Sequence, residues 1–161
     1  MPELPDLQIF SKNLMKRTAH RKIVSADVFN GSRLNITGET MRTKLLGTNI
    51  ADIVRKGKEL YFQLKNNEVF SVHLMLSGRF HVCAWEEVSG IPYKILSMGF
   101  EGDEALVISD FQGMCRITFN PAETDTPDAR ELENVQGTIE FKNVTYAYDP
   151  SKEVLHNINL R

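Results

Sequence analysis

The first six residues, Met-Pro-Glu-Leu-Pro-Asp, contain residue types that could carry out covalent chemistry. Removal of Met1, which a small second residue permits, would leave Pro2 with a free secondary amine. A terminal α-amino group titrates near pH ~8, so a usable fraction is unprotonated at neutral pH. With the carboxylate of Glu3 beside it as a proton acceptor, this amine would be a nucleophile. The alternative is that Pro2 and Pro5 only stiffen the entry to a helix, because proline fits the first helical turn.

Four later stretches combine charged, polar and aromatic side chains at expected turns or strand ends. Residues 55–58 (Arg-Lys-Gly-Lys) form a basic turn, and residues 73–79 form an apolar loop that ends in Ser-Gly-Arg. Residues 110–113 (Asp-Phe-Gln-Gly) form a polar–aromatic turn, and residues 146–148 read Tyr-Ala-Tyr. Each stretch also has an ordinary interpretation: a solvated turn for the basic residues, strand core for the apolar loop, and an alternating strand for the tyrosines.

The composition is that of a globular protein, with 161 residues of which 42% are hydrophobic and 25% charged. The length fits one domain, or one small domain with an appendage. We find no signal-peptide pattern and no apolar run long enough to cross a membrane, so we expect no membrane association. The predicted location is the cytoplasm of a bacterial-type cell, with association to the nucleoid at most. The scattered cysteines and histidines have no metal-site spacing, so we expect no metal ion.

Charge is distributed unevenly along the chain. Residues 1–60 contain 11 Lys and Arg against 6 Asp and Glu, whereas residues 122–161 contain 4 against 8. A basic first part is compatible with phosphate binding, and the contrast indicates different partners for the two ends.

Hydrophobic spacing predicts a mainly β fold with flanking helices. Leu7, Phe10, Leu14 and Met15 recur at helical spacing and predict an amphipathic helix over residues 5–20. A second, short helix is expected between Thr37 and Gly47. The expected strands are residues 23–29, 50–55, 60–64, 69–76, 80–84, 93–100, 105–109 and 115–119. Short strands separated by turn signals predict an antiparallel β-sandwich.

The last forty residues differ in character from the rest. Residues 122–136 are rich in Pro, Thr and acidic residues, which predicts a linker. Strands are expected beyond it over residues 137–142, 144–148 and 154–160. The predicted organisation is therefore a β-sandwich domain over residues 1–121, the linker, and a short β-rich appendage over residues 137–161.

The chain resembles the N-terminal domain of the formamidopyrimidine-DNA glycosylase and endonuclease VIII family. The resemblance rests on the initial Pro-Glu-Leu-Pro, the Gly-Lys at residues 57–58 and residues 73–78, and it covers residues 1 to about 121. It implies damaged double-stranded DNA as the partner and base-excision repair as the process. In this family the terminal proline amine attacks C1′ of a damaged nucleotide that is flipped out of the duplex.

The resemblance also implies a role for individual residues. Pro2 would be the nucleophile that forms an iminium intermediate, and Glu3 would move protons at the sugar ring oxygen. Lys58 would hold a flanking phosphate during β- and δ-elimination, so that the strand is nicked as well as the base removed. Leu76 would fill the gap left by the flipped base, although the strand-core interpretation of Leu76 stays open. The other expected DNA contacts are Arg55, Lys56, Arg79 and Gln112.

Two departures from the family limit these expectations. The turn at residues 110–113 lacks the arginine pair that the family often carries, and Phe111 or Gln112 could substitute for it. No helical module or zinc finger of the family follows residue 121, so we expect a weakened grip on DNA and weak or lost activity. A non-catalytic DNA- or protein-binding module, or a truncated or composite chain, is the alternative.

Residues 131–161 resemble the opening strands of an exporter-type ATP-binding cassette. Tyr148 would then match the aromatic residue that stacks on adenine. The chain contains no Gly-x-x-x-x-Gly-Lys-Ser/Thr loop to cradle the phosphates, so we expect no cofactor and no ATP hydrolysis. A non-hydrolysing cassette fragment is therefore a third interpretation.

Overall fold

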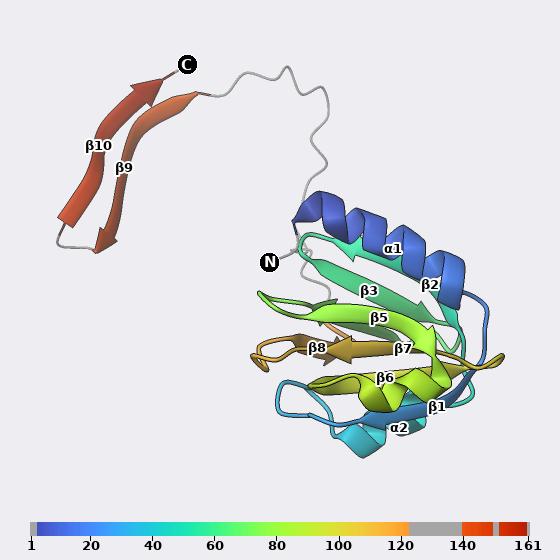
Figure 1. The fold of residues 1–161 in the computed structure, drawn as a ribbon. Helices are drawn as coiled ribbons and strands as arrows, with labels where there is room; N and C mark the ends of the chain where they lie inside the picture. The colour runs from blue at the N-terminus through green and yellow to red at the C-terminus, as the bar shows by residue number, and fades with distance from the viewer. Residues whose placement is uncertain (1–2, 123–139, 150–151, 161) are drawn as a thin grey trace, which may run out of the picture. The chain divides into compact units, whose positions relative to one another are not determined.

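The structure, a computed structural model, describes residues 3–122, 140–149 and 152–160, without the side chains of residues 147–149 and 152–153. The chain divides into two units, Met1–Ala122 and Glu123–Arg161, which we describe separately. Both units consist mainly of antiparallel strands (Figure 1), so the predicted fold class is confirmed.

Two four-stranded antiparallel sheets build the first unit. One sheet has the order β1 (Ile23–Val28), β6 (Lys94–Phe100), β7 (Glu104–Ser109) and β5 (Arg79–Ala84). The other has the order β2 (Ile50–Lys56), β3 (Glu59–Leu64), β4 (Val69–His73) and β8 (Arg116–Phe119). A 3₁₀-helix, Trp85–Gly90, follows β5.

Side chains from both sheets form one hydrophobic core. Phe62 of β3 and Phe70 of β4 are cross-strand partners with 0% of their surface exposed, and their rings stack with centroids 4.6 Å apart. Alternate residues of a strand face the same side, which is why β3 contributes Leu60, Phe62 and Leu64 to this core.

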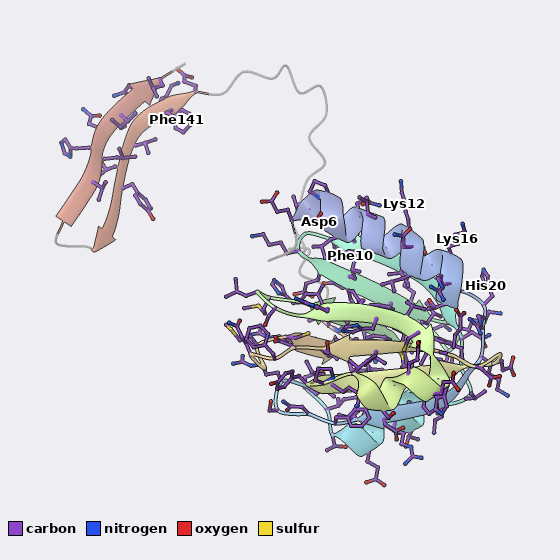
Figure 2. All side chains as sticks on the ribbon, in the orientation of Figure 1. Asp6, Phe10, Lys12, Lys16, His20 and Phe141 are labelled. Atoms are coloured by element: carbon purple, nitrogen blue, oxygen red, sulfur yellow. The ribbon has the colours of Figure 1, made fainter. Side chains whose placement is uncertain are left out.

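Helix α1 (Leu4–Thr18) lies along β2 and β3 (Figure 1). Leu7 and Leu14 are buried, and the buried Ser11 hydroxyl donates to the Ile53 carbonyl oxygen at 2.6 Å. Figure 2 shows Phe10 on the side of α1 that faces the sheets, with Lys12 and Lys16 pointing away. The helix therefore has the amphipathic face that its sequence predicts.

Helix α2 (Gly38–Leu45) is the short helix expected between Thr37 and Gly47. The Thr37 hydroxyl caps its start by accepting from the Thr40 N–H at 3.1 Å. Gly47 follows its end with φ of +81°, a conformation that glycine adopts at little cost.

Two strand predictions are wrong. The strand expected over residues 69–76 ends at His73, because the chain turns at Met75 with φ of +55°. In the second unit, residues 141–149 form one strand, β9 (Phe141–Asp149), where the sequence predicts a break between 142 and 144. Asn143, with φ of +50°, adds an irregularity to this strand without ending it.

Strand β9 pairs with β10 (Lys152–Leu160) in a two-stranded antiparallel sheet. The predicted linker beyond Ala122, together with residues 137–139, lies outside the described residues. The predicted domain boundaries therefore stay a prediction.

In the part of the chain that the structure describes, no helix is long and apolar enough to cross a bilayer. Within the same residues, no group of three or more His, Cys, Asp or Glu side chains is placed to hold a metal ion.

Replacing Phe62 with alanine should reduce the free energy of unfolding by about 3–5 kcal/mol, because the change leaves a cavity inside the core. The exposed Phe111 provides the control, and Phe111→Ala should cost at most about 1 kcal/mol. Denaturant unfolding of both variants checks the expectation. Equal losses would contradict the placement of the core.

Candidate active site

Three of the sequence-predicted stretches meet at one end of the sheet β2-β3-β4-β8. Leu60 lies opposite Val72, so the turn before β3 and the loop after β4 share this end. His73, the last residue of β4, pairs with Arg116, the first residue of β8. The turn at residues 110–115 leads directly into β8 and therefore lies at the same end.

Arg55 connects this end of the sheet to helix α1. Its Nε donates to Gln8 Oε1 at 3.2 Å, and its Nη1 donates to the Gly57 carbonyl oxygen at 3.0 Å. Gln8 is five residues after Glu3, and a helix rises 1.5 Å per residue, so Glu3 lies about 7.5 Å further along the helix axis. Both contacts of Arg55 are within the protein, which makes Arg55 a residue that positions the basic turn.

Glu3 and Lys58 are exposed at this end. The Glu3 N–H donates to Asp6 Oδ2 at 2.9 Å at the start of α1. Lys58 follows Gly57, whose φ of +57° suits the tight β2–β3 turn. The Lys56 ammonium lies 5.1 Å from the centre of the Tyr61 ring, a cation–π contact. Pro2 lies outside the described residues.

The loop between β4 and β5 presents Leu76 to solvent. Leu74 is 2% exposed and closes the core, whereas Leu76 is 56% exposed, so the strand-core interpretation of Leu76 is wrong. The His73 ring accepts from the Met75 N–H at 3.1 Å, which stabilises the turn. A Cβ at Gly78 would lie 2.4 Å from the Leu74 carbonyl oxygen, so the loop needs a glycine there.

A buried carboxylate, Asp110, ties this loop to the next turn. Its Oδ1 accepts from the Ser77 hydroxyl and from the Gln112 N–H at 3.1 Å. Its Oδ2 accepts from the N–H groups of Met114 at 2.6 Å and Cys115 at 2.7 Å. Asp110 is 4% exposed, so these four donors replace the water that a carboxylate requires.

The same contacts set the protonation of Asp110. Burial alone would raise the pKa of its carboxyl, but the hydrogen bonds from Ser77 and the three backbone N–H groups outweigh burial and lower it. Burial, with a smaller effect of Asp110, raises the pKa of the neighbouring Cys115 thiol to about 12. Asp110 is therefore ionised at neutral pH, and Cys115 is not.

Gln112 and Arg79 lie on the two segments that Asp110 joins. Gln112 Oε1 accepts from the Ser77 hydroxyl at 3.3 Å. Arg79 is exposed at the start of β5 and, after burial, is the second cause of the lowered pKa of His81. The His81 ring lies 2.7 Å from the Ser109 hydroxyl through Nε2. The described candidates of the first unit therefore lie around one end of the sheet. The side chain of Tyr148 lies outside the described residues.

A groove with a volume of about 1570 Å³ runs from this end between α1 and β5. Leu76, Arg79 and Phe111 line it near the loops, and Arg17 and Arg21 line it at the far end. Both of these arginines form ion pairs with Glu104, and their hydrogen bonds lower the pKa of its carboxyl.

Residues 1–117 match the family model of the formamidopyrimidine-DNA glycosylase N-terminal domain. The chain belongs to this family. The family resemblance identified from the sequence is thereby confirmed, and the fold agrees with it.

Relatives of known identity extend beyond the length of this chain. The formamidopyrimidine-DNA glycosylase of Protochlamydia amoebophila is 31% identical over 112 residues, which cover 68% of this chain and 40% of the relative. That of Lactiplantibacillus plantarum is 26% identical over 159 residues, covering 96% of this chain and 58% of the relative. The chain therefore spans less than two thirds of the length of either enzyme.

Solved structures show the same fold. The Lactococcus lactis formamidopyrimidine-DNA glycosylase, crystallised non-covalently bound to DNA with an abasic site, matches with a TM-score of 0.68 and 24% identity. The match covers 73% of this chain and 45% of that protein. At this identity the match supports the fold alone.

Sequence reasoning missed the residues that position the site. The sequence does predict a turn at residues 110–113, because an Asp whose carboxylate accepts from the N–H two residues later is a recognised turn signal. The contact of Asp110 with Ser77, 33 residues earlier, had no signal in the sequence. The same holds for the bond between Gln8 and Arg55, which are 47 residues apart.

Replacing Asp110 with asparagine should destabilise the protein by about 2 kcal/mol or more at pH 7, because an amide cannot accept all four donors. The pKa of Asp110 is lower in the folded state, so its carboxylate stabilises the fold above pH ~4. This stabilisation disappears as the pH falls through the folded-state pKa. The difference in melting temperature between wild type and Asp110→Asn should therefore narrow from pH 7 to pH 3.

Asp103→Asn, at an exposed turn, is the matched control and should change the melting temperature little at either pH. If the difference in melting temperature between wild type and Asp110→Asn stays constant from pH 7 to pH 3, Asp110 is not an ionised carboxylate that stabilises the fold through its hydrogen bonds.

Proposed function

We propose that the first unit is the N-terminal, chemistry-bearing part of a DNA glycosylase with abasic-site lyase activity. The observation that carries this proposal is the convergence of Glu3, Lys58 and Leu76 at one end of a fold that belongs to the formamidopyrimidine-DNA glycosylase family. Damaged double-stranded DNA is the proposed substrate.

The proposed chemistry begins with the amine of Pro2 after removal of Met1. The amine nitrogen forms a bond to the sugar C1′, and the bond from C1′ to the damaged base breaks with the electron pair leaving on the base. The Glu3 carboxylate takes the proton that the amine nitrogen loses and delivers it to the ring oxygen as the ring opens, which gives a cationic iminium. Loss of a C2′ proton to a base then expels the 3′ phosphate, and Lys58 offsets the charge that develops on this phosphate.

The neighbouring residues would hold DNA in place. Leu76 is exposed on a loop that is closed by internal hydrogen bonds, and its side chain can fill the space left by a flipped nucleotide. Arg79 and Lys56 are exposed cations suited to backbone phosphates, and Gln112 offers an amide on the adjoining turn. Residues 1–121 contain 15 Lys and Arg against 13 Asp and Glu, so we propose a weak grip with a shallow salt dependence.

Borohydride reduction with a labelled abasic-site duplex should trap a covalent protein–DNA adduct. A variant that retains Met1 should give no adduct, because its Pro2 nitrogen is part of a peptide bond. Pro5→Gly is the matched control, since it changes a proline of the same motif and leaves the terminal amine free. Gel electrophoresis detects the adduct, and mass spectrometry establishes the N-terminus of each preparation. If a folded protein with a free Pro2 amine gives no adduct, the proposal is wrong.

Lys58→Ala should slow strand cleavage by about tenfold to a hundredfold, because one cation stabilises the developing charge. Lys65→Ala is the control, since Lys65 is exposed in the β3–β4 turn at the other end of the sheet. Single-turnover cleavage of the abasic duplex measures both. Equal effects of the two changes would show that Lys58 contributes only general positive charge.

A further inference from the structure

A second, smaller pocket lies at the end of the first unit that is opposite the candidate active site. Its volume is about 290 Å³, and β1, β6, the β6–β7 turn and the start of the 3₁₀-helix line it. Strand β5 runs from Arg79, beside the loop that carries Leu76, to Ala84, which directly precedes the pocket residue Trp85 (Figure 1). The length of this strand puts the two sites about 17 Å apart along the sheet, so the pocket is separate from the proposed DNA site.

The indole ring of Trp85 forms one wall of this pocket. Trp85 is 42% exposed, and its backbone N–H donates to the Asp103 carbonyl oxygen at 2.8 Å. A Cβ on Gly99 would lie 2.7 Å from Cζ3 of the indole and 2.3 Å from the Ser25 hydroxyl oxygen. The ring therefore rests on the backbone of β6 in space that glycine leaves open, and the exposed part of the ring lines the pocket.

The Asp103 carboxylate provides negative charge at the pocket. Asp103 is exposed, and within the part of the chain that the structure describes its carboxylate has no hydrogen-bond or ion-pair partner. The other carboxylate of the pocket, Glu104, differs because Arg17 and Arg21 form ion pairs with it. Asp103 is therefore the charge that a ligand of the pocket can pair with.

Acidic residues outnumber basic ones around the pocket. Two of them follow Trp85 in the 3₁₀-helix, and the others lie in or next to the β6–β7 turn. The nearby cations are the two arginines that pair with Glu104 and one lysine whose carbonyl oxygen accepts from the turn. Five acidic residues against three basic ones give a local net charge of −2, which attracts cations. These residues are Glu86, Glu87, Glu101, Asp103 and Glu104 against Arg17, Arg21 and Lys22.

The features of the pocket select an organic cation of limited size. An indole face attracts positive charge, and an adjacent carboxylate pairs with it. Pockets that hold drug-sized ligands measure about 300–1,000 Å³, so a pocket at the lower limit of this range fits a single side chain. Val24, which is 54% exposed and lines the pocket, offers apolar surface to a neighbouring residue of the same ligand.

We propose that this pocket docks a partner protein through a Lys or Arg side chain that lies next to an apolar residue. The stem of the basic side chain packs on Trp85, its charged head pairs with Asp103, and the apolar neighbour covers Val24. The charge of the pocket and the charge of this ligand are complementary, which favours such a protein segment over an anionic partner. This interaction goes beyond the proposed lyase activity and does not depend on it.

Trp85 is the one tryptophan of the chain, so its fluorescence reports directly on the pocket. The probe is an acetylated and amidated Ala-Lys-Val-Ala peptide, and the control peptide has norleucine, which keeps the stem and lacks the charge, in place of lysine. The lysine peptide should shift the emission of the full-length chain in a saturable way. The norleucine peptide should bind at least about tenfold more weakly, since it loses both the cation–π contact and the ion pair.

Two variants test the residues that make the pocket. Asp103→Asn should weaken binding of the lysine peptide about fivefold, as expected for an exposed ion pair. Glu39→Gln, which removes the same charge from an exposed position on α2, is the matched control and should leave binding unchanged. Gly99→Ala should displace the indole and abolish the saturable shift. Melting temperatures establish that each variant is folded, and Asp103→Asn decides alone if Gly99→Ala is unstable.

Three results would overturn the docking pocket. The first is equal binding of the lysine and norleucine peptides, and the second is equal binding of the lysine peptide to wild type and Asp103→Asn. The third is binding of n-butylamine, the isolated lysine side chain, as tightly as the peptide, which would make the pocket a site for free amines.

The outcomes for the two proposals differ. Asp103→Asn should trap abasic duplex DNA as well as wild type does, because Asp103 is remote from the candidate active site. Normal trapping without saturable peptide binding would refute the docking pocket alone. Peptide binding in a protein that has a free Pro2 amine and forms no adduct would refute the lyase activity alone.

Discussion

The carboxylate of Asp110 is the interaction on which the arrangement of the loops depends. A buried charge is costly unless donors surround it, and here one hydroxyl and three backbone N–H groups do so. These donors come from two segments that are more than thirty residues apart in the sequence. This single group thereby holds the loop that carries Leu76 against the turn that carries Phe111.

Helix α1 depends on a second set of polar contacts. The Ser11 hydroxyl and the Arg55 guanidinium fix the helix on β2 at two points along its length. Apolar contacts alone would allow the helix to slide, since they have little directional preference. The hydrogen bonds set the position of Glu3 relative to the β2–β3 turn, and with it the distance over which Glu3 and Lys58 could act on one substrate.

Local patterns account for what the sequence could predict. The 3.6-residue spacing of Leu7 and Leu14 identified α1, and the Gly57 turn identified the β2–β3 hairpin. The strand prediction failed where a tight turn interrupts the apolar pattern. Leu74 and Leu76 continue the apolar run of β4, but the close approach of Gly78 to the Leu74 carbonyl turns the chain away from the sheet. The partners of Asp110 and Arg55 depend on the register of the sheets, which no short stretch of sequence contains.

The loop from Leu74 to Gly78 has a consequence for how such a protein can diverge. At Gly78 any side chain would collide with the Leu74 backbone, so a substitution there would disrupt the conformation of the whole loop. Two residues earlier, Leu76 touches solvent and can change in size or polarity without loss of folding. The same loop thus contains Gly78, which cannot be substituted, and Leu76, which can. Different side chains can therefore be selected at residue 76 while the backbone of the loop stays the same.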